Sequence, residues 1–147
     1  MIRLETEGHL DAPPATVWQV LTDFAQYPAW NPLLPEARGE AKPGARVAMK
    51  ASAPGGAGKR FGFTATLVRC EPGQALEWTG GVPGVLHGHH YFRLSPEGAG
   101  TRLVHGEDFT GLLTVLFGRK RIEGMRRGYE GLNRALAEHV RTLVTPS

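Results

Sequence analysis

The sequence predicts an α+β protein in which a curved antiparallel sheet of about seven strands wraps around a long C-terminal helix. The first observation is an apolar stripe with helical spacing in residues 112–144, formed by Ile122, Met125, Tyr129, Leu132, Leu136, Val140 and Leu143. The second is a run of alternating segments from residue 46 onward, joined by connections of hairpin length that require antiparallel pairing. A sheet and a helix that each have one apolar face bury both faces by packing together.

The N-terminal third predicts a strand followed by one or two short helices. Apolar and polar residues alternate through residues 2–10, which is typical of a half-buried strand. Pro13 and Pro14 end this strand and suit the first turn of a helix that extends to about residue 23. Pro28 and Pro32 then exclude a continuous regular helix, so residues 27–32 are expected to form short helical turns.

The middle of the chain is expected to consist of strands. They are predicted at residues 46–51, 61–67, 76–80, 87–94 and 101–109, with turns at 53–58, 71–74, 82–84 and 96–100. No internal repeat, low-complexity tract or linker interrupts the 147 residues. We therefore expect residues 1–147 to be a single domain.

Composition limits the classes of function. The single cysteine, Cys70, excludes an internal disulfide and favours a reducing, cytoplasmic compartment. No apolar run approaches the ~20 residues of a membrane-spanning helix, and the N-terminus lacks the apolar centre of a secretory signal. The net charge is +3, with basic residues concentrated at 119–127. Because no aromatic residues interleave with them, we expect a solvated face rather than a nucleic-acid site, with a protein-binding face as the alternative.

Three glycines in the C-terminal segment require an explanation. Gly124, Gly128 and Gly131 recur at helical spacing, and a glycine inside a helix costs about 1 kcal/mol relative to alanine. Two explanations fit the spacing. Either the helix approaches the sheet closely at these positions, or the missing side chains leave room for a ligand.

Alternation also brings three polar side chains to the inner face of the sheet. His90 shares a face with Phe92, and His105 and Glu107 share one with Phe109. A buried carboxylate alone is costly, so Glu107 is expected to pair with a histidine. Three interpretations compete: a structural polar pair, recognition of a ligand's polar group, and general acid–base catalysis. A metal site of two histidines and one carboxylate fits by ligand count alone, and we predict none.

Several segments resemble a known superfamily across essentially the whole chain. They are residues 12–18 (Ala-Pro-Pro-Ala-Thr-Val-Trp), 22–24, 27–32 (Tyr-Pro-Ala-Trp-Asn-Pro), 76–78, 88–94 and 101–111. Together with the order of elements, they resemble the START-like helix-grip superfamily, and in particular its bacterial SRPBCC branch of polyketide cyclase/dehydrase and lipid-transport proteins. The Trp-Asn-Pro segment and the stretch at 105–111 carry the resemblance to that branch.

The resemblance implies a helix-grip fold with a hydrophobic cavity between sheet and helix. On this basis we expect the protein to bind a small hydrophobic, lipid- or polyketide-like molecule without a cofactor. The expected ligand-binding residues are Phe61, Phe63, Trp78, His90, Phe92, His105, Glu107, Phe109, Met125 and Tyr129. Trp30 and residues 81–86 are expected to edge the entrance. The alternative is a cyclase or dehydratase that uses His90, His105 and Glu107 as acid–base groups; the oligomeric state, including a homo-oligomer, is left open.

Overall fold

The computed structural model describes residues 1–52 and 58–144. Its strands are β1 (Ile2–Leu10), β2 (Glu36–Arg38), β3 (Arg46–Ser52), β4 (Arg60–Glu71), β5 (Ala75–Val82), β6 (Leu86–Glu97) and β7 (Gly100–Thr110). Its helices are α1 (Pro14–Thr22), the 3-10 turn η1 (Phe24–Gln26), α2 (Tyr27–Trp30), α3 (Leu112–Glu123) and α4 (Arg126–Val144). The expected connection at residues 53–58 lies, except for Gly58, outside the described residues.

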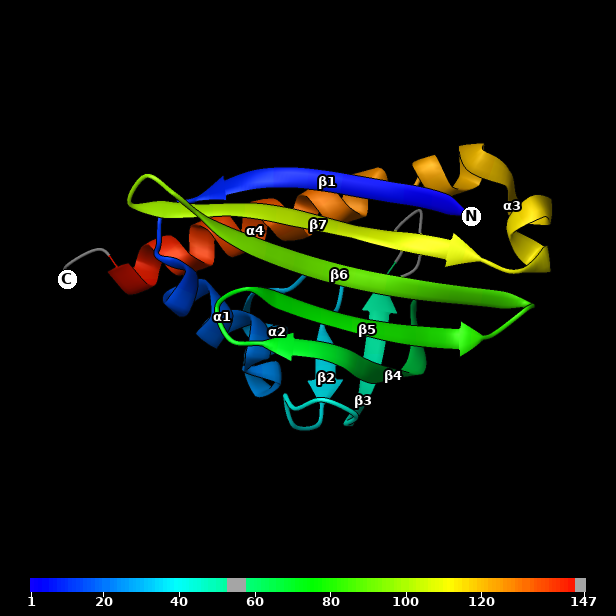
Figure 1. Ribbon diagram of the computed structural model, residues 1–147, viewed down its shortest axis with the longest axis horizontal. Coiled ribbons are helices and arrows are strands. Elements are labelled where there is room, and N and C mark those ends of the chain that lie inside the picture. The colour runs from blue at the N-terminus through cyan, green and yellow to red at the C-terminus, as the bar shows by residue number, and fades with distance from the viewer. Residues whose placement is uncertain (53–57, 145–147) are drawn as a thin grey trace.

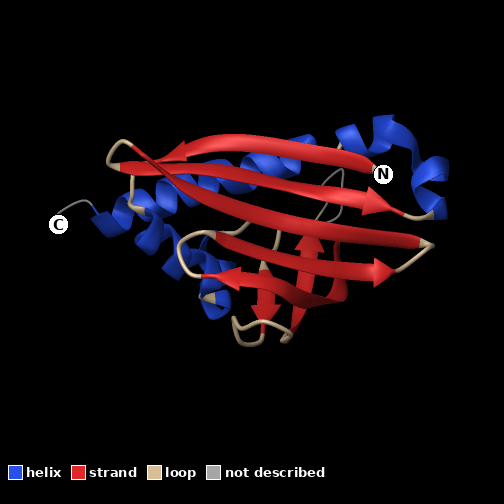
Figure 2. Cartoon of the chain, in the orientation of Figure 1, coloured by secondary structure: helices blue, strands red, loops and turns tan. Residues whose placement is uncertain are grey.

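All seven strands form one antiparallel sheet in the order β1-β7-β6-β5-β4-β3-β2. Successive strands from β2 to β7 are neighbours, while β1 joins the far side of β7. The strands turn strongly across the sheet, so that β2 and β3 run nearly crosswise to β1 and β7 in Figure 1. The helices lie behind this curved sheet and beyond one end of it (Figure 2). The predicted α+β helix-grip architecture is thus confirmed.

The C-terminal segment is helical, but it is not the single helix expected over residues 112–144. Gly118 has φ 72° and ψ 163°, which interrupts α3, and residues 124 and 125 separate α3 from α4. A positive φ of this kind is readily adopted only by glycine. The gripped helix is therefore α4, which runs behind β1 and β7 and buries Tyr129, Leu132, Asn133, Leu136 and Val140 (Figure 1). Leu143, expected on the buried stripe, is 56% exposed near the end of α4.

The structure supports neither explanation for Gly124, Gly128 and Gly131. A Cβ built on Gly128 would meet Leu33 at 3.3 Å, and one on Gly131 would meet only Arg134. For Gly124 the nearest atoms belong to its own preceding turn. No sheet atom is among these neighbours, because the three glycines face the loop after α2 or solvent and not the sheet. The helix therefore neither approaches the sheet there nor widens a space against it.

The main core lies between α1, α4 and the central strands. It contains large, fully buried side chains, among them Tyr27, Leu67, Leu76, Phe92 and Leu136. A second, smaller apolar cluster of Leu4, Phe109, Ile122 and Tyr129 closes the space between β1, β7 and the start of α4. The polar side chains predicted on the inner face lie where these two clusters meet.

Candidate functional site

The three predicted polar residues meet on the inner face of the sheet. His90 on β6 lies opposite Glu107 on β7, and His105 lies opposite Phe92. The site is continued on β1 by Thr6, which lies opposite His105. The inner-face positions were predictable from alternation, and the register of β6 and β7 makes the three side chains direct neighbours.

A hydrogen-bonded chain from α4 fixes the protonation of His105. Asn133 donates from Nδ2 to Thr6 Oγ1 at 2.8 Å, and Thr6 donates to the His105 carbonyl oxygen at 2.7 Å. With its amide oriented in this way, Asn133 accepts from His105 Nδ1 at 2.8 Å. Burial, and then the charge of His90, hold the pKa of His105 well below its ordinary value. His105 is therefore neutral, with its proton on Nδ1 and a lone pair on Nε2.

This tautomer determines what His90 must carry. His90 Nε2 lies 2.7 Å from His105 Nε2, so His90 is the donor in that contact. Its other nitrogen, Nδ1, lies 3.0 Å from Glu107 Oε1. Two lone pairs cannot face each other at this distance, so one proton lies between Nδ1 and Oε1. The pair is either imidazolium with carboxylate or neutral imidazole with carboxylic acid, and its total charge is zero in both forms.

Tyr129 on α4 completes the pair from the other side. Its hydroxyl donates to Oε1 of Glu107, the same oxygen that faces His90. Burial and the neighbouring carboxylate raise the pKa of Tyr129 well above its ordinary value, so the hydroxyl keeps its proton. The pairing expected for Glu107 is therefore present, with a tyrosine added to the histidine.

Aromatic rings enclose the two imidazoles. His105 lies between Phe92 and Tyr129, with ring centroids at 4.3 and 4.9 Å and nearly parallel planes. His90 stacks on Trp78 at 4.9 Å and on Tyr129 at 5.3 Å.

Because the imidazoles hydrogen-bond directly to each other, no gap for an ion separates them. Among the residues that the structure describes, no group of three or more His, Cys, Asp or Glu side chains is placed to hold a metal ion.

Glu107 is the member of the cluster that reaches solvent. Its side chain is 17% exposed, whereas that of His90 is 7% exposed and His105 is fully buried. Within the described residues, Oε1 has two hydrogen-bond partners and Oε2 has none. Oε2 lies over Gly88 on β6, which is paired with Gly80 on β5. Because neither glycine has a side chain, the Glu107 carboxylate lies over Gly88 and the Phe63 ring lies close to Gly80.

The other expected ligand-binding residues fall into two groups. Trp78, Phe92, Phe109 and Tyr129 are buried among their neighbours in the core. Phe63 and Met125 are half-buried, and Phe61, although it shares the inner face with Phe63, is 52% exposed at the rim of the sheet. Of the expected residues, Phe61, Phe63, Met125 and Glu107 thus keep part of their surface exposed.

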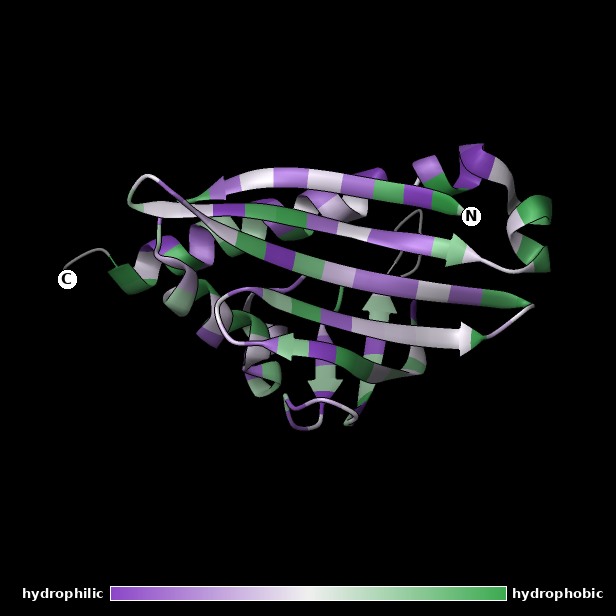
Figure 3. Cartoon of the chain, in the orientation of Figure 1, coloured by the Kyte–Doolittle hydropathy of each residue, from purple (hydrophilic) through white to green (hydrophobic). Residues whose placement is uncertain are grey.

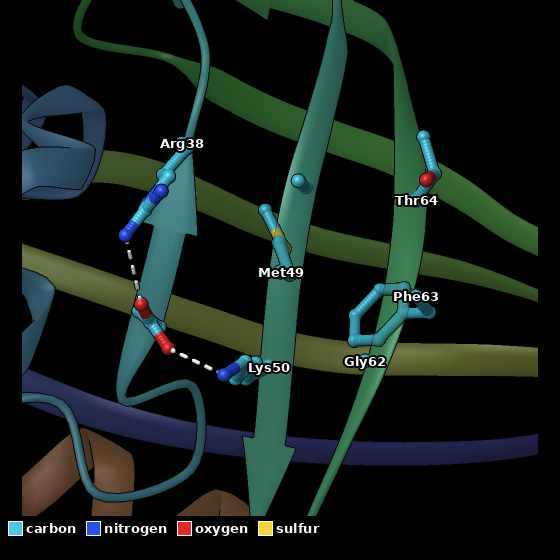
Figure 4. A pocket seen from close by; sticks show the side chains of 8 residues that line it. Arg38, Met49, Lys50, Gly62, Phe63 and Thr64 are labelled. Carbon is cyan, nitrogen blue, oxygen red and sulfur yellow. Dashed lines mark hydrogen bonds and ion pairs between the residues drawn. The ribbon is translucent and has the colours of Figure 1, made fainter.

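Two surface hollows formed by described residues lie away from this cluster. The larger, about 470 Å³, is lined by residues of β2, β3 and β4, six of which are labelled in Figure 4. Glu36 bonds both Arg38 and Lys50, so the three charged side chains at this hollow are paired with one another. The second, about 330 Å³, lies between β2 and the segment around Phe24 and Pro28. Neither is lined by His90, His105 or Glu107.

Sequence reasoning missed two members of the polar cluster and misplaced one aromatic residue. The spacing of the sequence contained a signal for both. Asn133 follows Tyr129 by four positions and therefore lies on the buried stripe of the helix, and Thr6 follows Leu4 by two positions and therefore lies on the inner face of β1. Trp30 was expected at the entrance beside residues 81–86. It is instead buried, in contact with Tyr27 and stacked on His139 near the C-terminal end of α4.

A second buried carboxylate, not anticipated, lies on the outer face of the sheet. Glu77 on β5 is 3% exposed and is bonded by Arg69, His89 and Arg93. Burial opposes its ionisation, but the hydrogen bonds from Arg93, His89 and Arg69 outweigh burial and lower the pKa of Glu77. With every oxygen engaged, this cluster holds the strands together and offers no free group.

Comparisons with known proteins give a consistent family and fold. The sequence profile of the family described as polyketide cyclase / dehydrase and lipid transport matches residues 1–144. A search of curated protein sequences finds no significant match. Among the described residues, no helix is long and apolar enough to cross a membrane.

Solved structures with this architecture come from several bacteria. The ZhuI aromatase/cyclase from Streptomyces sp. R1128 superposes with a TM-score of 0.77 at 18% identity, covering 98% of this chain and 96% of that one. TTHA0849 from Thermus thermophilus gives 0.76 at 18% identity, covering 98% and 100%. CalU16 from Micromonospora echinospora gives 0.69 at 23% identity, covering 98% and 77%. At these identities the likeness concerns the fold alone.

Proposed function

Because the chain belongs to the polyketide cyclase / dehydrase and lipid transport family, we propose that it binds a small, largely apolar molecule between the sheet and α4. The observation that carries this proposal is the Oε2 of Glu107, which has no hydrogen-bond partner among the described residues and lies over Gly88. A ligand site needs apolar walls and a few polar groups that orient one end of the ligand. Phe61, Phe63 and Met125 supply the walls here.

The rest of the cluster limits where the ligand lies. His105, Phe92 and Trp78 are packed against one another and offer no room. The ligand therefore occupies the half of the inner face nearer the β5–β6 turn, with a hydroxyl or enol group donating to Oε2. His90, Tyr129 and the neutral His105 act behind Glu107 by holding its carboxyl group in place.

A direct test is native mass spectrometry of the protein from its producing cells, followed by solvent extraction and identification of any retained compound. Calorimetric titration of that compound into Glu107→Gln and Phe61→Ser should then give affinities reduced by roughly tenfold each. Val68→Ser is the matched control for Phe61→Ser. Both side chains are about half exposed on β4, but Val68 is not among the accessible inner-face residues.

Two results would end the binding proposal. One is a protein that retains no small apolar compound and in which a crystal structure shows side chains filling the space beside Gly80 and Gly88. The other is a bound compound whose affinity is unchanged by both Glu107→Gln and Phe61→Ser.

An enzymatic role is a second candidate, and the proton shared by His90 and Glu107 favours it. A group that holds one proton at the edge of an apolar space can give it to, or take it from, a bound substrate. The reaction class would be cyclisation or dehydration of a poly-ketone chain. Turnover of such a chain, measured at saturating concentration, should then fall in Glu107→Gln, because the amide cannot relay the proton. Equal turnover in the wild type and Glu107→Gln would exclude this role.

A further inference from the structure

An apolar patch projects beyond the sheet on α3 and the β5–β6 turn. Leu112, Val115 and Leu116 are 72–78% exposed, and Val82 and Val85 lie beside them with about half of their surface exposed. The first three recur at steps of three and four residues and so share one side of the helix. Figure 3 shows this hydrophobic turn of α3 in green at the right-hand end of the molecule. Five large aliphatic side chains gathered in solvent are unusual for a soluble surface.

The patch is held in place by the backbone. The amide nitrogens of Leu112 and Leu113 donate to the carbonyl oxygens of Gly84 and Val85 at 3.0 and 2.8 Å. Gly111, at φ 108°, packs so closely on Val85 that a side chain at that position would overlap its carbonyl oxygen. The start of α3 and the β5–β6 turn therefore form one surface, and its apolar side chains are displayed without a change of fold.

Positive charge follows the apolar side chains directly. Residues 112–127 contain five basic residues and one acidic residue, so this segment alone exceeds the +3 net charge of the whole chain. Glu123, the acidic one, is bonded to Arg126. Arg119 and Lys120 are exposed immediately after the kink at Gly118, and the hydrophilic turn lies next to the hydrophobic one in Figure 3.

We propose that this surface, Val82, Val85, Leu112, Val115 and Leu116 with Arg119 and Lys120, docks the protein reversibly on an anionic lipid bilayer. Short apolar turns that enter the acyl boundary, flanked by Lys and Arg at the headgroups, are the pattern of interfacial membrane binding. A protein partner would also cover an apolar patch. The adjacent excess of basic residues, however, matches the negative surface potential of a membrane. This proposal does not depend on whether the inner face binds a ligand.

The test is flotation of the full chain with phosphatidylcholine vesicles that contain either no phosphatidylglycerol or about a third of it. We expect binding to the anionic vesicles, with partitioning at least roughly tenfold weaker on neutral ones and in high salt. The triple variant Leu112→Ser/Val115→Ser/Leu116→Ser should lose binding, while Val68→Ser, an exposed valine on β4, should bind as the wild type does.

A second pair of variants separates local charge from total charge. Arg119→Gln/Lys120→Gln should weaken binding to anionic vesicles. Lys42→Gln/Arg46→Gln removes the same number of charges at the other end of the sheet and should bind normally. Circular dichroism checks that each variant is folded. The proposal is overturned if the wild type does not float with anionic vesicles, or if either α3 variant binds undiminished. A wild type that self-associates but does not bind vesicles, together with a monomeric triple variant, would show that the patch is a protein interface and would also overturn the proposal.

Discussion

The carboxylate of Glu107 lies directly over the α-carbon of Gly88, in the space that the Cβ of any other residue would occupy. This close approach allows the Glu107 carboxylate to lie over β6 while Oε1 stays bonded to His90 and Tyr129. The fixed position of this carboxyl group thus depends on a residue with no side chain of its own.

Gly88→Ala should therefore disturb the polar cluster and cost roughly 1–3 kcal/mol of unfolding free energy, because the new methyl group displaces a carboxylate held by two hydrogen bonds. Gly80→Ala is the matched control. The two glycines are paired across β5 and β6, but a Cβ on Gly80 would meet the Phe63 ring at an ordinary 3.6 Å. Urea denaturation of both variants checks the difference, and equal stabilities would refute the close approach.

The neutral, buried His105 predicts a particular pH dependence. Its pKa is lowered in the folded state, so below about pH 6.5 the unfolded chain binds a proton that the folded chain does not. Stability should fall as the pH decreases through this range, by up to ~1.4 kcal/mol per pH unit from this residue. In His105→Gln that part of the slope should vanish, although the variant is less stable overall. Denaturation curves measured between about pH 5 and 7 provide the comparison; an unchanged slope would contradict a neutral His105.

The raised pKa values of the three tyrosines predict that the protein also loses stability at alkaline pH. Burial is the main reason that the pKa of each is raised, assisted by Glu107 at Tyr129, by Glu5 at Tyr91 and by Asp23 at Tyr27. The folded protein therefore keeps protons that the unfolded chain releases above about pH 10, so stability falls as the pH rises beyond that point. Phenolate absorbance should appear only together with unfolding. Reversible tyrosine ionisation near pH 10 with native circular dichroism would contradict this expectation.

Two carboxylates on the outer face of the sheet test whether burial determines how much an ion pair contributes to stability. Arg69 bonds both Glu77, whose side chain is 5% exposed, and Glu71, which is 49% exposed. Glu77→Gln should cost roughly 2 kcal/mol, less than the ~3–5 kcal/mol typical of a broken buried pair, because Arg69 and Arg93 are partly hydrated. Glu71→Gln should cost less than Glu77→Gln, because an exposed ion pair is screened by water.

The pH dependence gives a second check on Glu77. The pKa of Glu77 is lowered, so its contribution is present at neutral pH and is lost as the pH falls below its ordinary value of 4.5. Glu77→Gln should remove that part of the acid sensitivity. If Glu71→Gln is the more costly of the two substitutions, burial does not control these interactions.

Much of the fold follows from local patterns. The alternation at residues 2–10 and 46–109 predicted strands that the structure contains, and hairpin-length connections gave their antiparallel order. The same alternation placed His90, His105 and Glu107 on the inner face. It could not show that Gly118 divides the last segment, because the helical spacing of apolar residues continues across that glycine.

The sequence by itself determined the architecture and the residue types on the inner face, because a period of two or 3.6 residues fixes which side chains share a side. Only the tertiary structure decided what those residues do. The register of β6 against β7 and the approach of Asn133 and Tyr129 from α4 are long-range relationships, and they set the tautomer of His105, the proton between His90 and Glu107, and the free oxygen of Glu107. Which inner-face residues are packed and which stay accessible is likewise decided by how closely α4 lies on the sheet, a distance that no local pattern encodes.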